Sequence, residues 1–426
     1  MFLIVFLVLE TTLYGYPTWR VLSAAPWSPM VNAIVIAGVV LTALATPVYV
    51  LTIRASSLSR AVREALAWVA YMLLAVAGVI FGLFVARDAI WLGIWLLGFV
   101  VEGFDLVFLP ASIHLLNLSI LGAACLLTIY GAIGAHRTPR VRHVEIPIDD
   151  LPVALESLRI VQLTDLHVGP TIKRPFVSRV VDATNALQPD LIVFTGDLAD
   201  GTATGLAHDV APLADLQCRF GPYFVTGNHE YYSDPSGWMQ ALPGLGFDVL
   251  LNEHRSIEWV SPLGERSSPL AERSSPLAER SSPLAERSSP TTGGSSPSPE
   301  AARLVIGGVP DPNGAEYEDA LPGHRPDPQA VFRDAPEGVR LLLAHQPRSG
   351  VDAIEATGAA LTLSGHTHGG QLGLWRYLVR LQQPVVSGLA RRCGAWIYVS
   401  RGVGYWGPPC RLGAPSEITC LRLVRA

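Results

Sequence analysis

Five short blocks of the sequence carry side chains that can bind metal ions or move protons. They lie between residues 165 and 371 and contain aspartate, asparagine and histidine. The blocks are Asp165-Leu-His167, Gly196-Asp197, Gly227-Asn228-His229-Glu230, the isolated His345, and Gly365-His366-Thr-His368-Gly-Gly-Gln371. A lone histidine is more often structural than a ligand, so the blocks are informative only when they are taken together.

Together the blocks offer two carboxylates, one amide oxygen and four imidazoles, with His229 left over. Mixed nitrogen and oxygen ligands suit zinc, iron, manganese or cobalt, and they disfavour a calcium site or a thiolate site. The five cysteines agree with this, because none is in CxxC spacing and their number is odd,. The sequence therefore predicts a centre for transition-metal ions.

Each block follows a short apolar run that is typical of a buried strand. The runs are Arg159–Thr164, Asp190–Thr195, Pro222–Thr226, Val339–Ala344 and Ala360–Ser364. Short strands that alternate with helical stretches indicate a layered α/β domain. Because strand ends in such domains open onto one edge, we expect the five blocks to meet at one point.

The order D-x-H, G-D, G-N-H-[D/E], H and G-H-x-H resembles that of the calcineurin-like metallophosphoesterases. All five blocks are present and in order between about Arg159 and Leu423. The Ala-His-Gln-Pro and Gly-His-Thr-His-Gly-Gly-Gln forms are similar to those of the family's bacterial membrane-anchored branch. The resemblance implies an α/β fold, namely a four-layer α/β/β/α sandwich. It also implies that the protein hydrolyses a phosphoester or pyrophosphate bond at a dinuclear metal centre.

The resemblance also implies which residues hold the metal ions. One ion would bind to Asp165, His167, Asp197 and His368, and the other to Asp197, Asn228, His345 and His366. Asp197 would bridge the two ions, which are divalent or trivalent ions of manganese, iron, zinc or cobalt. Two cations about 3.5–4 Å apart can clamp the attacking and leaving oxygens of a phosphoryl displacement and make hydroxide available near pH 7.

His229 follows a predicted ligand but is not itself a ligand in the family pattern. We therefore expect it to be catalytic, either by stabilising the transition state or by protonating the leaving oxygen. The alternative is a structural role, in which His229 only donates a hydrogen bond to the metal ligands.

The first third of the chain is much more apolar than the rest. Half of all residues are hydrophobic and 16% are charged, whereas a soluble protein carries about 25% charged residues. Val31–Ile53, Ala65–Ala86 and Ala111–Gly134 are long enough to cross a bilayer,. Met1–Tyr16 is a shorter fourth candidate, and Ala89–Leu109 is ambiguous because it contains two acidic residues.

These runs divide the chain into three parts. We predict an all-α transmembrane region of four or five spans at 1–134, a linker and domain entry at 135–157, and a metallophosphoesterase domain at 158–426. The net charge of −5 provides no basic field for nucleic acid,. The expected partners are therefore the membrane and a phosphoester substrate, and not nucleic acid.

Clusters of arginine favour a cytoplasmic catalytic domain. Three arginines follow Val31–Ile53 before the next run, and three more follow Ala111–Gly134. Both clusters are cytoplasmic if Ala89–Leu109 does not cross, which gives four spans in a bacterial inner membrane. If that segment crosses, the chain has five spans and the domain lies on the other side.

A seven-residue unit, Ser-Pro-Leu-(Gly/Ala)-Glu-Arg-Ser, is repeated four times in Ser261–Ser288. Each copy has one proline and one apolar residue, so the repeat can form neither a regular helix nor a coiled-coil seam. We predict a disordered insert at 261–299, in the tip of a hairpin formed by Ser256–Val260 and Arg303–Val309.

The membrane anchor suggests a lipid-linked substrate. Proteins that this branch resembles include enzymes that cleave UDP-diacylglucosamine, which makes that lipid the named candidate; a nucleotide or a phosphoprotein is the alternative substrate. A different class of protein, a catalytically inactive membrane sensor that binds a metal or ligand, is disfavoured by the complete ligand set.

Overall fold

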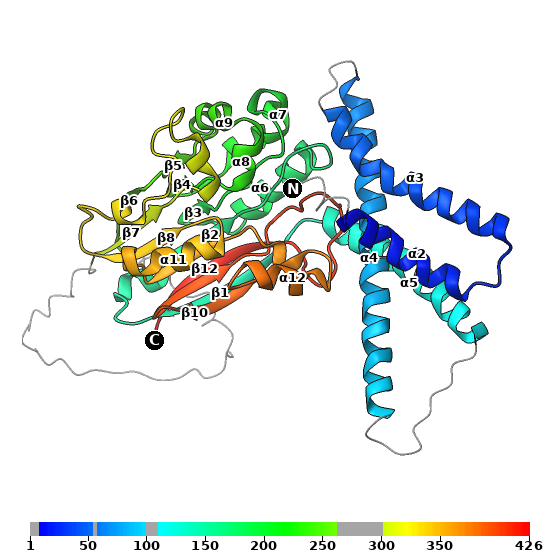
Figure 1. Ribbon diagram of the computed structural model, residues 1–426. Helices are drawn as coiled ribbons and strands as arrows, with labels where there is room; N and C mark the ends of the chain where they lie inside the picture. Colours follow the sequence, from blue (N-terminus) through cyan, green and yellow to red (C-terminus); the bar gives the residue numbers. More distant parts are fainter. Residues whose placement is uncertain (1–7, 54–57, 99–109, 262–300) are drawn as a thin grey trace, which may run out of the picture.

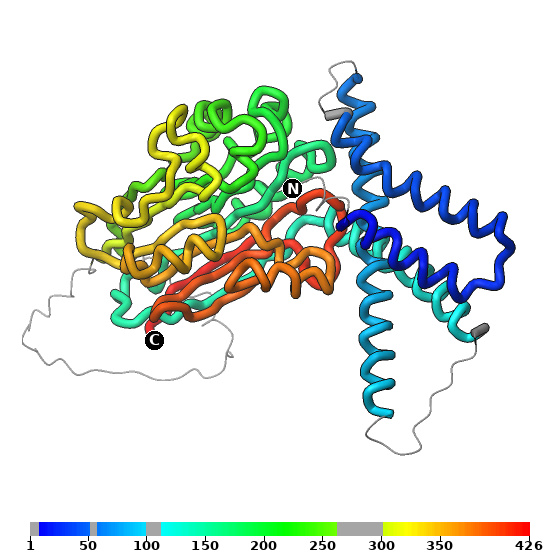
Figure 2. The backbone as a smooth tube through the Cα atoms, viewed as in Figure 1, coloured from blue at the N-terminus to red at the C-terminus, as the bar shows by residue number. Residues whose placement is uncertain are grey.

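The computed structural model describes residues 8–53, 58–98, 110–261 and 301–426. They form an α/β domain and a group of long apolar helices that lies on one side of it (Figure 1). The backbone tube shows the same division, with the blue N-terminal segments gathered away from the green, yellow and orange segments (Figure 2).

Two six-stranded sheets form the middle of the α/β domain. Their strand orders are β1-β12-β2-β3-β4-β5 and β10-β11-β9-β8-β7-β6. The first sheet contains β1 (Arg140–Ile148), β12 (Glu417–Arg425), β2 (Arg159–Leu163), β3 (Leu191–Phe194), β4 (Phe220–Phe224) and β5 (Asp248–Val249). The second contains β10 (Gly388–Arg392), β11 (Ala395–Val399), β9 (Leu361–Ser364), β8 (Val339–Leu343), β7 (Ala302–Gly308) and β6 (Glu253–Trp259).

Helices cover the outer face of each sheet. Those on the first sheet are α6 (Arg174–Asn185), α7 (Ala203–Val210) and α9 (Pro235–Ala241), and those on the second are α10 (Pro328–Val331) and α11 (Pro347–Thr357). Two short helices, α8 (Asn228–Ser233) and α12 (Trp375–Gln382), lie near the edge where the predicted ligands gather. Single turns of 3₁₀-helix are η2 (Val153–Ser157), η3 (Ala211–Asp215), η4 (Pro243–Leu245), η5 (Pro312–Tyr317) and η6 (His368–Gly370).

Side chains along each strand point alternately to the two faces of the sheet, and this alternation produces the layers. In β8, Leu341 and Leu343 point into the core between the sheets, whereas Leu342 points into the core beneath α11. In β2, Ile160 belongs to the inter-sheet core and Val161 to the core beneath α6. Successive side chains of a strand point to opposite faces, so each sheet is buried on both sides. The result is the four-layer α/β/β/α architecture that the sequence predicted.

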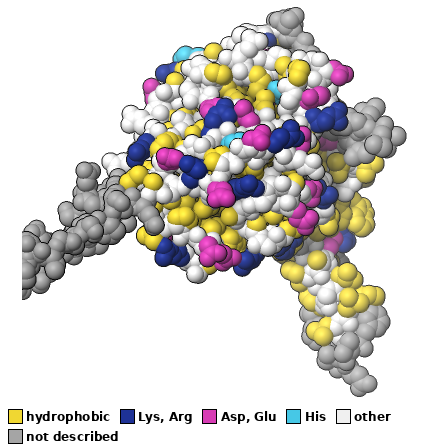
Figure 3. Space-filling model, turned by 90° about the vertical axis from the view of Figure 1, so that its left-hand side faces the viewer, with side chains coloured by type: hydrophobic (Ala, Val, Ile, Leu, Met, Phe, Trp, Pro, Cys, Tyr) yellow, Lys and Arg dark blue, Asp and Glu magenta, His cyan; other side chains and the backbone are white. Residues whose placement is uncertain are grey.

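Figure 3 shows the end of the α/β domain that faces away from the apolar helices, where arginine side chains are interspersed among aspartate, glutamate and hydrophobic side chains.

Helices α2 (Tyr16–Ala24), α3 (Pro29–Ile53), α4 (Arg60–Gly98) and α5 (Pro110–His136) form the second part of the structure, preceded by a π-helical turn, η1 (Thr11–Gly15). Among the described residues, α3, α4 and α5 are long and apolar enough to cross a membrane. The predicted span Met1–Tyr16 lies partly outside the described residues, so it stays a prediction.

Helix α4 differs from the sequence-based expectation. It runs without a break through Ala65–Ala86 and into the first part of Ala89–Leu109, which had been treated as separate segments. At about 1.5 Å per residue its 39 residues extend to roughly 58 Å, well beyond a hydrocarbon core of about 30 Å. Residues 99–109 lie outside the described part of the chain, so the number of spans and the sidedness stay predictions.

Two adjacent charged residues in the last third of α4, Arg87 and Asp88, are paired. Arg87 Nη2 lies 2.6 Å from Asp88 Oδ1, and Arg20 of α2 donates from Nε to Asp88 Oδ2 at 2.7 Å. Arg87 also donates to the Asn117 side chain of α5. A polar network therefore joins three apolar helices, as is usual for ionisable groups in such surroundings.

The first half of α4 is attached to the α/β domain. Arg60 pairs with Asp209 at 2.6 Å, and Glu64 pairs with Lys173 at 2.6 Å. Further along, Gly78 and Gly82 of α4 lie beside the segment that begins α12, and a Cβ at Gly82 would make an ordinary contact with Leu374 at 3.7 Å.

Strands β6 and β7 pair antiparallel from Glu253–Gly308 to Trp259–Ala302. The predicted hairpin on either side of the repeat is therefore present. The predicted disordered insert 261–299 falls outside the described residues, apart from Ser261, and stays a prediction.

This hairpin generates the first testable prediction. Deleting Pro262–Pro299 and closing the strands with a short turn should leave metal content unchanged, because the pairing ends before the insert. A loop about ten times shorter should raise the free energy of unfolding by about 2 kcal/mol. Plasma mass spectrometry and urea denaturation would measure the two quantities, and loss of metal from the deletion variant would contradict the prediction.

Candidate metal centre

The structure brings all seven predicted ligands to one edge of the two sheets. Asp165 and His167 follow β2, Asp197 follows β3, and Asn228 begins α8 after β4; His345 follows β8, and His366 and His368 follow β9. The strands that precede these residues are parallel neighbours within each sheet, β2-β3-β4 in the first and β8-β9 in the second. Their carboxyl ends therefore face the same way, as the sequence-based interpretation required.

One group of ligand atoms contains Asp165, His167 and His368, all within 4.8 Å of one another. The Nε2 atoms of the two histidines face each other at 3.0 Å, and His368 Nε2 lies 3.6 Å from Asp165 Oδ1. All three side chains are buried.

A second group contains Asp197, His345 and His366. His345 Nε2 lies 3.1 Å from Asp197 Oδ2 and 3.1 Å from the Asn228 side-chain oxygen. His366 Nδ1 lies 2.9 Å from the same Asn228 oxygen and 3.2 Å from His345 Nε2. Asn228 therefore joins this group, as expected from its place in the sequence.

Asp197 lies between the two groups. Its Oδ2 atom is 3.1 Å from His345 Nε2 in one group and 3.6 Å from His167 Nε2 in the other. A carboxylate in this position can contact two cations at once.

The histidine tautomers suit metal binding. His345 Nδ1 lies 2.7 Å from the Thr195 carbonyl, and His167 Nδ1 lies 3.0 Å from Asp200 Oδ1. Each Nδ1–H therefore donates outward, so that Nε2, which faces the cluster, is the nitrogen available to a metal ion. Metal-binding histidines in proteins are oriented by hydrogen bonds of this kind.

Charge inside the cluster is poorly balanced by the protein alone. Burial would lower the pKa of His345, but the Asp197 carboxylate raises it to about 10. Burial, together with nearby His345, lowers the pKa of His366 to about 3. Burial also raises the pKa of Asp165. Imidazoles and carboxylates buried side by side form a donor set that cations would stabilise, so the residues fit a metal centre.

Strained backbone positions the predicted ligands. Asp165, His167, Asp197, His366 and His368 all have positive φ, between 50° and 70°. Residues other than glycine adopt this region at a cost of about 1–3 kcal/mol, typically where function requires it.

Two glycines make room for the carboxylates. A Cβ at Gly227 would overlap Asp197 Oδ1, and a Cβ at Gly365 would overlap Asp165 Oδ2. The glycines beside the ligand blocks therefore reflect close packing as well as turns.

His229 lies at the edge of the cluster and is oriented by Asp200. His229 Nδ1 is 2.6 Å from Asp200 Oδ1, and the His229 backbone N–H donates to Asp197 Oδ1 at 2.9 Å. Burial would lower the pKa of His229, but the Asp197 and Asp200 carboxylates raise it to about 9. These carboxylates therefore favour the protonated ring. One ring nitrogen of His229 also lies within 4.8 Å of the ligand atoms of His167 and Asp197, close enough for His229 to join a metal site.

Two acidic residues of the site had no role predicted from the sequence: Asp200, which lies outside the five blocks, and Glu230, which lies within one of them. Asp200 contacts both His167 and His229, and its only sequence signal is that it follows Asp197 by three residues. Glu230 is buried and accepts the backbone N–H groups of Asp197, Leu198 and Gly227 at 2.6–3.0 Å. It therefore fixes the loop after β3 against the start of α8.

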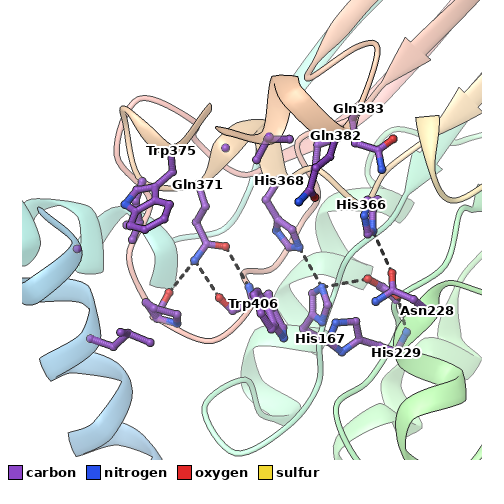
Figure 4. Close-up of a pocket in the computed structure, with 18 of the residues that line it drawn as sticks. His167, Asn228, His229, His366, His368, Gln371, Trp375, Gln382, Gln383 and Trp406 are labelled. Atoms are coloured by element: carbon purple, nitrogen blue, oxygen red, sulfur yellow. Dashed lines mark hydrogen bonds and ion pairs between the residues drawn. The ribbon is translucent and has the colours of Figure 1, made fainter. Parts of the chain in front are cut away.

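The cluster opens into a cavity of about 470 Å³ that reaches the apolar helices. His167 and His368 point toward each other and His366 points toward Asn228 at one end, while Trp375 lies toward α4 at the other (Figure 4). Leu13, Leu74 and Gly78 of the N-terminal helices also line this cavity. One wall is therefore polar and carries the predicted ligands, and the other is apolar and belongs to α4 and its neighbours.

Comparison with known proteins agrees with this geometry. The family model for calcineurin-like phosphoesterases matches residues 158–370. The chain is 33% identical over 306 residues to a Danio rerio protein and 37% identical over 303 residues to a Bos taurus protein, both named transmembrane protein with metallophosphoesterase domain. These matches cover 70% of this chain and 61% and 60% of those proteins, so the chain spans about three fifths of their length. An uncharacterized metallophosphoesterase of Aquifex aeolicus is 30% identical over 294 residues, which cover 67% of this chain and 91% of that protein.

The shared position of Asp197 generates the second prediction. Asp197→Asn should lower the number of bound metal ions per chain from two to less than one, because both groups lose the same carboxylate. Asp352→Asn, at an exposed position on α11, is the matched control and should keep both ions. Plasma mass spectrometry after dialysis against Mn²⁺ would count the ions, and two ions retained in Asp197→Asn would refute the bridging position.

Proposed function

Because the chain belongs to the calcineurin-like phosphoesterase family, we propose that its clustered side chains hold two metal ions and hydrolyse a phosphoester or diphosphate bond of a membrane-embedded substrate. Asp165, His167, Asp197 and His368 would hold one ion, and Asp197, Asn228, His345 and His366 the other. The observation that carries the proposal is the convergence of both groups on Asp197.

Bound cations would polarise the phosphoryl oxygens and lower the pKa of a coordinated water. The chain's own part in the reaction is to hold the phosphate and to move a proton. The Asp197 and Asp200 carboxylates raise the pKa of His229 and so favour its protonated form, and Asp200 accepts the hydrogen bond from Nδ1, which leaves Nε2–H to donate. A protonated imidazole beside the cluster can stabilise charge on the phosphate or transfer its proton to the leaving oxygen.

The cavity supports a lipid-linked substrate. It connects the ligand groups with Leu13, Leu74 and Gly78, which belong to the apolar helices. A headgroup could therefore sit beside His229 while its acyl chains contact apolar side chains. UDP-diacylglucosamine is one lipid with this chemistry, and a soluble nucleotide or phosphoprotein would leave the apolar wall without a role.

Turnover of bis-p-nitrophenyl phosphate with Mn²⁺ tests the proposed phosphoester hydrolysis. The His229→Ala variant tests the proposed catalytic role of His229. The variant should keep both metal ions and lose about 10²–10⁴-fold in kcat, because proton donation contributes about that much. His208→Ala, at a side chain that is 75% exposed and outside the cluster, is the control and should behave like the wild type.

The outcomes separate the competing roles. Loss of metal from His229→Ala would place this residue among the ligands. A folded wild-type protein that turns over no phosphoester with any divalent metal would favour a membrane sensor.

We further propose that the catalytic domain is cytoplasmic in the inner membrane, from the arginine clusters on either side of the apolar runs,. Cys393 is an exposed native reporter on the α/β domain. In a variant that carries Cys125→Ser and Cys218→Ser, an impermeant maleimide should label Cys393 in intact bacteria only after lysis, and adding Cys393→Ser should abolish that signal. Labelling of Cys393 before lysis would reverse the orientation.

A further inference from the structure

Helix α12 and the residue before it carry an exposed apolar stripe. Leu374, just before the helix, and Tyr377, Leu378 and Leu381 within it are spaced three and four residues apart, so they lie on one face,. Their exposed fractions are 42%, 60%, 51% and 79%. Single exposed apolar residues are ordinary, but a continuous stripe indicates a surface that binds something.

The neighbouring face of α12 lines the catalytic cavity. Trp375, Val379 and Gln382 face the same cavity as His366 and His368. Helix α12 therefore lies between the candidate metal centre, on one side, and the apolar stripe, on another.

The third face of α12 is basic. Arg376 and Arg380 are exposed and one helical turn apart, and within the described part of the chain neither forms an ion pair. Apolar and basic faces on one short helix are typical of helices that lie in a membrane interface, where the cations meet anionic headgroups.

The stripe continues the exposed apolar surface of α4. Trp375 packs against Phe81 with ring centroids 6.2 Å apart, and Leu374 lies beside Gly82. From Val85 onward α4 exposes large apolar side chains, including Ile90 at 62%. Helix α12 is thus attached to α4 near the point where the buried part of that helix gives way to its exposed apolar part.

A lipid surface fits these features better than a second copy of the chain does. Two copies that met through the stripe would bring Arg376 and Arg380 close to their own counterparts, with no described acidic residue on α12 to compensate. Anionic phospholipid complements the arginines, and its acyl chains complement the leucines.

We propose that α12 lies in the bilayer interface, with its leucine stripe among acyl chains, and forms the wall past which a lipid-linked phosphoester enters the cavity. This role in substrate entry rests on the proposed function, whereas the contact with lipid does not.

Photocrosslinking tests the lipid contact without any catalysis. Leu381 is replaced with p-benzoylphenylalanine in the full chain, which is reconstituted in vesicles of phosphatidylcholine and phosphatidylglycerol. Irradiation should add the mass of one phospholipid. The same replacement at Val153, which is 45% exposed on η2 of the α/β domain, is the control and should add none. Crosslinks between two chains, or no lipid adduct at Leu381, would overturn the proposal.

A matched pair of substrates tests the entry route. Hexadecyl p-nitrophenyl phosphate in the same vesicles and bis-p-nitrophenyl phosphate in solution present the same leaving group. Leu378→Gln combined with Leu381→Gln should lower turnover of the lipid substrate by about tenfold, because two apolar side chains no longer anchor the helix. Turnover of the soluble substrate should stay within about twofold, since neither leucine lines the cavity.

The remaining outcomes are distinguishable. Equal losses on both substrates, or no loss on either, would refute the entry route. Wild-type protein that turns over neither substrate would refute the proposed function instead, and the lipid adduct at Leu381 would still decide whether α12 contacts the bilayer.

Discussion

The buried carboxylate of Asp197 ties together loops that come from both sheets. The Oδ1 atom of Asp197 accepts a hydrogen bond from the backbone N–H of His229, and the Oδ2 atom lies 3.1 Å from His345 Nε2. The backbone carbonyl of Asp197 accepts a hydrogen bond from the N–H of Leu166. A carboxylate so far from water is costly unless cations and hydrogen-bond donors surround it. Three features accommodate the Asp197 carboxylate. They are the absence of a side chain at Gly227, the left-handed backbone of the neighbouring ligands, and the buried Glu230. The geometry of the site therefore follows from the need to place and neutralise Asp197.

The ligand set could be predicted because its signals are local. Each apolar run ends in a polar block, and parallel neighbours bring such ends to one edge whatever their order in the sheet. The order itself has no local signal: β12, from the end of the chain, lies between β1 and β2, parallel to one and antiparallel to the other. Asp200 was missed for a similar reason. Only the folded loop reveals that its carboxylate reaches both His167 and His229.

The helical region was harder to predict. A break after Ala86 was a reasonable expectation, because Arg87 and Asp88 interrupt an apolar run. Their partners, Arg20 and Asn117, lie far away in the sequence, so hydropathy could not reveal that the helix continues through them. The stripe of α12 is visible in the sequence as a periodicity, but only the structure shows which of its faces borders the cavity.

Helix α4 belongs to both parts of the molecule. Its first turns are paired with Asp209 and Lys173, its middle lines the cavity through Leu74 and Gly78, and its remainder is apolar and exposed. A fragment that begins at β1 would therefore lack the apolar wall that α4 contributes to the cavity. Helices in bilayers tilt as membrane thickness changes. A tilt of α4 would move one wall against the other, so that bilayer thickness and tension would act mechanically on the width of the cavity.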